Sequence, residues 1–202
     1  LTLKANIVRA DYGIENGVNI LKNITAKEKV ILTKGKSRAT GQFMTYDVEK
    51  KIVIISGSFQ TFSSPTGYVE SKKIIMFDDL KNKAMAKGNV KIILSNKNVI
   101  FADSVKADFT AKDKSLHKAI AKGNVIIESK EKGKKSKADL GIYNSSDEVV
   151  RLSGNVIIIN QNSILNGSKG ITNLKTGVSN IIGNPKKKER VKGIFSPIKK
   201  NK

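Results

Sequence analysis

Apolar and polar residues alternate along most of the chain with a period of two. In segment 150–158, alternate positions hold Val150, Leu152, Val156 and Ile158, whereas Arg151, Ser153 and Asn155 lie on the other face. The same alternation recurs in two further segments. Its apolar positions are Ala84, Ala86, Val90, Ile92 and Leu94 in one, and Ala119, Ala121, Val125 and Ile127 in the other. A period of two is typical of strands that bury one face. The pattern predicts β structure throughout.

A repeat organises the whole sequence. A Gly-Asn-Val-like motif recurs at intervals of about 30 residues, which is the length of one supersecondary unit. Its copies begin at Gly57, Gly88, Gly123, Gly154 and Gly183, and a degenerate copy, Lys22-Asn23-Ile24, precedes them. A polar turn and a short apolar run lie upstream of each copy. In most units an aromatic residue precedes this turn. Each unit therefore reads as two strands joined by a turn, followed by a second pair of short strands.

The fixed place of glycine within each unit indicates a bend. Glycine inside a strand marks a bulge or a close approach of backbone, since it has no Cβ. We expect Gly57, Gly88, Gly123 and Gly154 to bend the sheet along one line and fold it over on itself. The result is an open two-walled sandwich with Val and Ile rows inside and unpaired edges at its two ends.

Two segments carry a family resemblance. Ala39–Asp47 running to Ser56-Gly57, and Lys137–Asn144 running to Leu152–Val156, resemble the OstA-like/LptA family of lipopolysaccharide transport proteins. The resemblance covers about residues 1–185, and the ending 189–197 is similar to the basic tail of the soluble bridge proteins of this family. It implies an elongated, folded-over antiparallel β-jellyroll over 1–185 and a flexible basic tail over 186–202.

The resemblance also implies a function. Proteins of this family hold the acyl chains of lipid A in an apolar groove, receive lipopolysaccharide from an inner-membrane complex and pass it to an outer-membrane translocon. They join end to end through open sheet edges, so a head-to-tail homo-oligomer is expected. We therefore expect an exported, periplasmic protein whose signal peptide or anchor is missing from this chain. The membrane-anchored LptC family shares the fold and is the second alternative.

The inward-facing residues are the candidates for the groove. They are Val90, Ile92, Leu94, Val125, Ile127, Val156 and Ile158. Since period-two spacing gives only the face of a strand, a dry core and an open groove both fit these residues.

The charge pattern suggests where phosphates could bind. The chain has a net charge of +21, and only four of its 38 basic residues are arginine. A Lys/Asn/Ile bias of this kind also follows from an AT-rich genome. Lys87, Lys91 and Lys122 are candidate phosphate contacts, and segments 130–137 and 186–202 add further lysines. A nucleic-acid or polyanion-binding β protein is an alternative, although single-strand binders need aromatic stacking platforms. A structural β-repeat of a surface assembly is a third interpretation.

The sequence offers little for catalysis. Cysteine is absent and His117 is the only histidine, so neither a thiolate site nor a histidine-based metal site or triad can be assembled. Asp78 and Asp79 are adjacent in a strand-turn region and point to opposite faces. We expect a protein that is not an enzyme and needs no cofactor or metal.

Overall fold

The computed structural model describes residues 1–129, 133–173, 176, 178–184 and 189–196, and every regular element in these ranges is a β-strand. The strands are β1 (Thr2–Lys4), β2 (Ile7–Glu15), β3 (Val18–Lys34), β4 (Ser37–Asp47), β5 (Ile52–Ser56), β6 (Gln60–Ser64), β7 (Gly67–Ser71), β8 (Ile74–Asp78), β9 (Lys83–Leu94), β10 (Val99–Phe109), β11 (Leu116–Ser129), β12 (Lys134–Asn144), β13 (Val149–Asn160), β14 (Ser163–Asn173), β15 (Ser179–Ile182) and β16 (Lys192–Phe195). All sixteen pair antiparallel in one sheet, which confirms the predicted fold class. The described ranges contain no helix long and apolar enough to cross a membrane.

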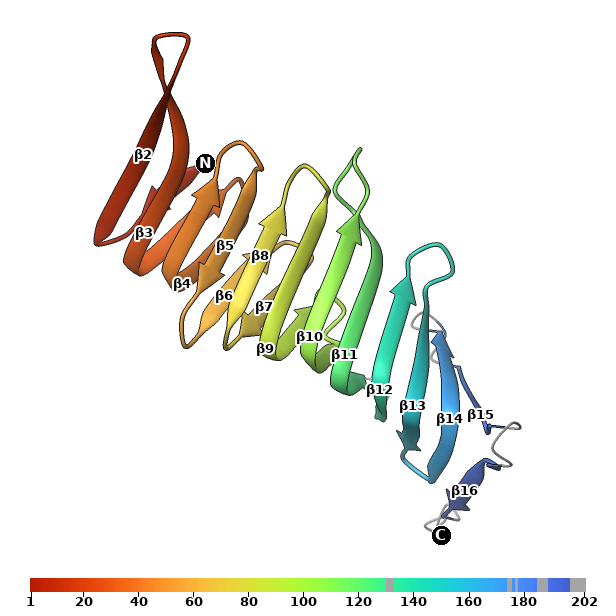
Figure 1. Ribbon diagram of the computed structural model, residues 1–202. Helices are drawn as coiled ribbons and strands as arrows, with labels where there is room; N and C mark the ends of the chain where they lie inside the picture. Colours follow the sequence, from red (N-terminus) through yellow and green to blue (C-terminus); the bar gives the residue numbers. More distant parts are fainter. Residues whose placement is uncertain (130–132, 174–175, 177, 185–188, 197–202) are drawn as a thin grey trace.

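The sheet is folded into two walls (Figure 1). We call the first wall the part that contains β2, β5, β8 and β15, and the second wall the part that contains β1, β6, β7 and β16. The long strands β3, β4 and β9–β14 contribute one half to each wall. Figure 1 shows them curving round at one edge, the crease, while hairpin turns project at the opposite edge, the mouth.

Paired left-handed residues form the crease. At Gly123-Asn124 the φ angles are 73° and 47°, and the β11–β12 register breaks between Lys122 and Val125. A Cβ on Gly123 would lie 2.1 Å from Asp103 Oδ2, so both the conformation and the close approach require glycine. Asn tolerates the left-handed region, and Asn124 Nδ2 donates to both Asp103 carboxylate oxygens at 3.0 and 3.2 Å. The bend is thereby tied to the neighbouring strand.

The same construction recurs along the crease. Gly88-Asn89 and Gly154-Asn155 also combine two positive φ angles, and Asn155 Nδ2 donates to Asp139 Oδ2 at 2.9 Å. Gly57 has a φ of 137° and lies between β5 and β6, where the strand is interrupted instead of bulged. Four of the predicted bend glycines therefore lie where the sheet turns from one wall to the other.

The two ends of the repeat are built differently from its centre. The first bend falls at Glu28-Lys29, with φ angles of 60° and 53°, and not at the degenerate copy Lys22-Asn23. Gly183 and Asn184 have no positive φ, and Asn184 forms an isolated bridge with Glu189. Within the predicted flexible tail, residues 192–195 form β16 and pair with β14. Residues 186–188 and 197–202 of that tail lie outside the described residues.

Three apolar clusters fill the space between the walls. The N-terminal cluster is Ala26, Val30, Ala39, Met44 and Ile55. The central cluster is Ile75, Ala86, Val90, Ala102, Val105, Ala121 and Val125. The C-terminal cluster is Ala138, Val150, Leu152, Val156 and Ile158. In the central and C-terminal clusters, the predicted inner residues Ala86, Val90, Ala121, Val125, Val150, Leu152, Val156 and Ile158 are all buried.

Candidate functional site

An apolar cavity of about 660 Å³ lies between the walls in the middle of the molecule. Its lining runs from Phe62 on β6 to Val150 on β13 and reaches the turns at the mouth. We call this cavity the groove. The buried N-terminal and C-terminal clusters lie on either side of it.

The groove exists because the inner side chains of the first wall are small in this part of the molecule. A cross-strand row on this wall reads Phe77, Ala84, Ala107, Ala119, Tyr143. A second row, nearer the crease, reads Ile75, Ala86, Val105, Ala121, Gly141, Leu152. Large residues stand at both ends of each row, and mostly alanine and glycine stand between them. Protein interiors are otherwise close-packed, so a run of small side chains on adjacent strands leaves a cavity.

The second wall supplies the large apolar surface that faces these rows. Its cross-strand row reads Phe62, Val69, Ile92, Ile100, Ile127. All five residues line the groove. The groove is therefore asymmetric, with branched and aromatic side chains on one wall and an alanine surface on the other.

The structure divides the predicted groove residues into two groups. Ile92, Leu94, Val125 and Ile127 line the groove. Val90, Val156 and Ile158 are buried in the clusters and are not part of the groove lining, whereas Val125 is both 1% exposed and part of that lining. Val90 and Val156 directly follow the bends, where the walls converge, and Ile158 packs with the large residues of the C-terminal cluster.

The three candidate lysines do not reach the groove. Lys87 and Lys122 are exposed, and they alternate with the inward-facing Ala86 and Ala121. Lys91 lies between the inward-facing Val90 and Ile92, and its Nζ is 3.6 Å from Glu70 Oε2. Period-two geometry places all three on the outer face of the sheet. The lysine-rich segment 130–137 is described only from residue 133.

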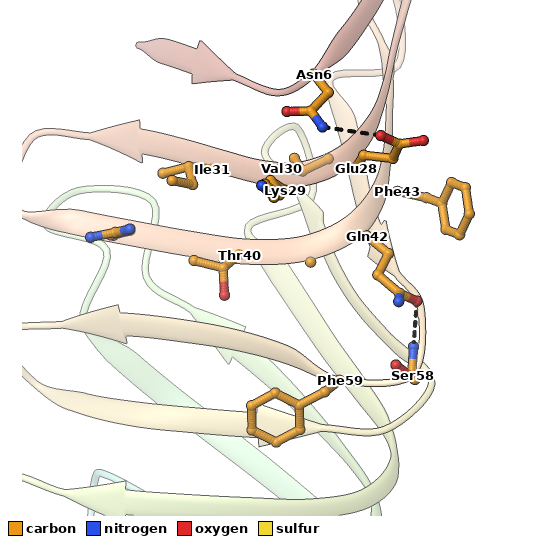
Figure 2. Close-up of a pocket in the computed structure, with 12 residues that line it drawn as sticks. Asn6, Glu28, Lys29, Val30, Ile31, Thr40, Gln42, Phe43, Ser58 and Phe59 are labelled. Atoms are coloured by element: carbon orange, nitrogen blue, oxygen red, sulfur yellow. Dashed lines mark hydrogen bonds between the residues drawn. The ribbon is translucent and has the colours of Figure 1, made fainter.

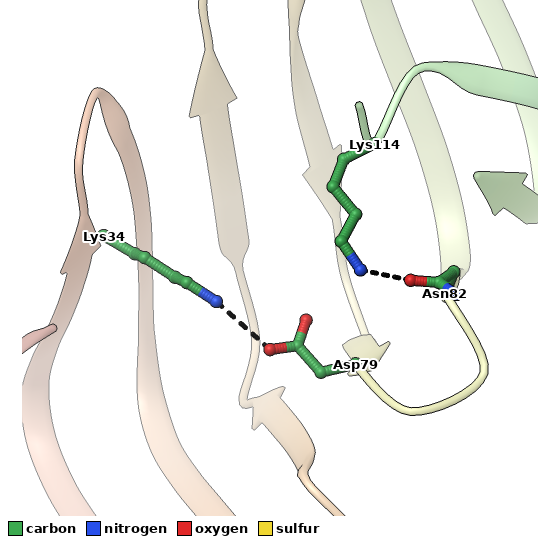
Figure 3. A network of polar contacts seen from close by, with 4 residues as sticks. All are labelled: Lys34, Asp79, Asn82 and Lys114. Carbon is green, nitrogen blue, oxygen red and sulfur yellow. Dashed lines mark hydrogen bonds and ion pairs between the residues drawn. The ribbon is translucent and has the colours of Figure 1, made fainter. Parts of the chain in front are cut away.

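The turns at the mouth supply the polar part of the lining. Lys114, Ser115 and Glu148 come from the first wall, and Ser64, Thr66 and Asn96 come from the second. The Lys114 ammonium donates to the Asn82 side-chain carbonyl in the neighbouring turn (Figure 3). A lipid headgroup at this edge would meet hydroxyl, amide and charged groups instead of apolar ones.

Hydrogen bonds fix the shape of the 110–115 turn. The Thr110 hydroxyl donates to Asp113, and the Ser115 N–H donates to the same carboxylate at 3.1 Å. These bonds favour the charged form and hold the pKa of Asp113 at about 2. The carboxylate is therefore ionised at neutral pH and holds Ser115 in place at the mouth.

Two tyrosines add hydroxyl groups to the groove. Tyr68 and Tyr143 both belong to its lining. Burial raises the pKa of each phenol above the ordinary value, and nearby carboxylates act in the same direction. Both side chains are neutral at physiological pH, so the groove gains hydrogen-bonding groups there without gaining charge.

A second hollow, of about 730 Å³, lies on the outside of the crease near the N-terminal end (Figure 2). Phe43 and Phe59 flank it and are 45% and 50% exposed. Ser58 N–H, in the interruption between β5 and β6, donates to Gln42 Oε1 of β4 at 3.0 Å. Glu28, Lys29 and Arg38 also line this hollow, so its surface mixes charges with apolar patches and is unlike the groove.

The acidic and histidine residues have structural positions. Asp78 accepts hydrogen bonds from Lys81 N–H at 2.9 Å and holds a turn, whereas Asp79 pairs with Lys34. His117 is exposed. In the described ranges no three His, Cys, Asp or Glu side chains are grouped so as to hold a metal ion. Several aromatics, including Phe62, Phe109 and Tyr143, line the groove and do not form an outer platform for nucleobases.

The alanine rows were missed by the sequence reasoning. Alanines at 84, 107 and 119 occupy inner positions where other units carry Tyr46, Val53 or Tyr143. Alanine in place of large residues on adjacent strands was the sequence signal for the groove. This signal can be recognised only when the strand register is known.

Comparisons with known proteins agree with this geometry. Residues 68–178, which supply most of the groove, match the family model described as "LptA/(LptD N-terminal domain) LPS transport protein". A solved structure with the same fold is LptH from Pseudomonas aeruginosa, described as the LptA-homologous periplasmic component of the lipopolysaccharide transport device. It is 16% identical, with a TM-score of 0.53 over 74% of this chain and 97% of that one. No curated protein sequence matches.

Proposed function

Because the chain belongs to the LptA/LptD N-terminal domain family of lipopolysaccharide transport proteins, we propose that it is a periplasmic carrier that holds the acyl chains of lipid A in the groove. Members of this family are transport proteins and not enzymes. The family model names LptA and the LptD N-terminal domain, and the similar solved structure is an LptA homologue, which favours an LptA-type carrier over the LptC alternative.

The observation that supports this proposal best is the apolar groove that opens at the mouth. Each methylene moved from water into such a groove gains about 0.8 kcal/mol. Several acyl chains together would therefore bind tightly through apolar contact alone. The polar turns, including Lys114 and Ser115, would leave sugars and phosphates of the same lipid in water at the mouth.

The net positive charge supports the choice of an anionic lipid. The chain has 38 basic and 17 acidic residues, and its outer faces carry lysines such as Lys87 and Lys122. A positive surface potential raises the local concentration of phosphate-bearing amphiphiles and speeds their encounter with the mouth. In this proposal the outer lysines act at long range, and the groove provides the binding energy.

The partners proposed are an inner-membrane complex that delivers lipid, an outer-membrane translocon that accepts it, and further copies of the chain. Among the described strands, β2 and β15 are the edges of the first wall, and β1 and β16 those of the second. Exposed apolar side chains lie at both ends, including Tyr12 at 64% and Phe195 at 72%. Such edges can pair with the strand of another molecule.

Tyr12→Glu is expected to weaken head-to-tail association at least about fivefold, because it places a charge on the exposed apolar surface of an edge strand. Sedimentation velocity over a concentration series measures the effect. Leu80→Glu is the matched control, since Leu80 is 57% exposed on a turn away from both ends. Equal association of the two variants would contradict pairing through β2.

Carrier function is tested by the lipid that the purified protein holds. Mass spectrometry of protein isolated from a Gram-negative envelope extract is expected to find lipid A species at near-stoichiometric amounts. Phospholipid in their place, or bound nucleic acid whose affinity falls steeply with salt, would contradict the proposal. The result is expected to persist at high salt, because apolar contact supplies most of the binding energy.

A further inference from the structure

The groove ends at an aromatic contact between the walls. Phe62 comes from β6 in the second wall and Phe77 from β8 in the first, and their ring centroids are 4.9 Å apart at an interplanar angle of 54°. Phe62 lines the groove and packs against both the central and the N-terminal clusters. The two rings thus separate the hollow section from the filled section.

The filled section, which holds the N-terminal cluster, has the same architecture as the section that holds the groove. It has the same two walls and the same inner rows, but large side chains fill the space between the walls. Among them, Met44 and Ile55 are only 2% and 0% exposed. The groove alone, at about 660 Å³, has the size of sites that hold one drug-sized molecule, roughly 300–1,000 Å³. A lipid with several acyl chains needs more room, and the N-terminal section is the adjoining apolar interior.

The filled section contains a buried side-chain amide, that of Gln60, whose hydrogen-bonding capacity is unused. Gln60 precedes Phe62 by two residues on the same inner face and is 0% exposed. In the part of the chain that the structure describes, neither Gln60 Nε2 nor Oε1 has a hydrogen-bond partner. A buried amide without partners raises the free energy of the closed arrangement. Separation of the walls would let this amide reach water or a polar group of a ligand.

At the mouth, an ion pair joins the two walls over this region. Lys34, at the second-wall end of β3, lies 3.1 Å from Asp79, which follows β8 in the first wall (Figure 3). The side chains are 70% and 57% exposed. An ion pair this exposed contributes little to stability and breaks readily.

We propose that the Phe62 and Phe77 rings form a gate and that the Lys34–Asp79 ion pair is its latch. When a lipid with several acyl chains binds, the ion pair breaks and the two rings separate. The groove then extends into the N-terminal section. This inference rests on the proposed carrier function. The crease continues through both sections, so the walls can open at the mouth without loss of strand pairing.

The latch can be locked chemically. The chain has no cysteine, so the double variant Lys34→Cys/Asp79→Cys reacts with a short bismaleimide only at the latch. The matched control is the same variant capped with N-ethylmaleimide. Linked protein is expected to bind lipopolysaccharide at least about tenfold more weakly than capped protein, while a fluorescent single-chain fatty acid binds both forms equally.

The outcomes separate the gate from the carrier function. Equal lipopolysaccharide affinity of linked and capped protein would overturn the gate, and so would an equal loss for both ligands. If no form binds either ligand, the carrier function itself is overturned. A second variant, Gln60→Met, removes the unsatisfied amide at similar volume and is expected to raise Tm and slow lipopolysaccharide uptake severalfold. Unchanged uptake and an unchanged or lower Tm would overturn the role of Gln60.

Discussion

Replacing Ala119 with phenylalanine is expected to weaken lipopolysaccharide binding at least tenfold while the protein stays folded. Ala119 lies in the alanine row between Ala107 and Tyr143 and lines the groove. A ring at this position would occupy the volume that acyl chains need. Exclusion of only two methylenes costs about 1.6 kcal/mol, and 1.4 kcal/mol corresponds to tenfold in affinity. Equilibrium binding of a fluorescent lipopolysaccharide measures the loss.

Ile120→Phe is the matched control for this experiment. Ile120 is the next residue of β11 and lies opposite Ile142, so the same ring is added on the outer face. Circular dichroism should show native β structure for both variants. If Ala119→Phe binds lipopolysaccharide as well as Ile120→Phe does, the acyl chains do not occupy the alanine side of the groove.

Ile158→Arg is expected to lower the free energy of unfolding by about 4 kcal/mol or more, because it buries a charge without a partner. Ile158 is 1% exposed in the C-terminal cluster. For a chain of this length, each kcal/mol shifts Tm by roughly 2–4 °C, so Tm should fall by about 10 °C or more. Thermal unfolding followed by circular dichroism measures this change.

Ile92→Arg provides the comparison, since Ile92 has the same inner parity but lines the groove. Its guanidinium can extend toward the mouth, so we expect a much smaller change in Tm together with loss of lipid binding. If both arginine variants destabilise the protein equally, the distinction between groove and core on the second wall is wrong.

The strand faces and the line of bends could be predicted because both depend on local sequence. Period-two alternation fixes which side chains point inward, and Gly-Asn supplies two residues that tolerate positive φ. The first bend could not be found in this way. Glu28 and Lys29 adopt the left-handed region without glycine, and nothing in their local sequence signals that conformation.

Whether an inner residue meets lipid or another side chain could not be predicted from alternation. Ile92 and Ile158 look equivalent in sequence, yet one faces alanines and the other faces Val150 and Leu152. The difference depends on cross-strand neighbours, which come from distant parts of the chain. The lysines show a related limit, since Lys87, Lys91 and Lys122 are close in sequence to groove residues but lie on the other face.

Each long strand belongs to both walls, and this has a consequence for how such proteins vary in length. Insertion or deletion of one hairpin, such as β11 with β12, would lengthen or shorten both walls by the same amount. Their alignment across the interior, and the terminal edges, would stay unchanged. Duplication of a unit during evolution could therefore produce longer or shorter conduits of constant cross-section without redesign of either end.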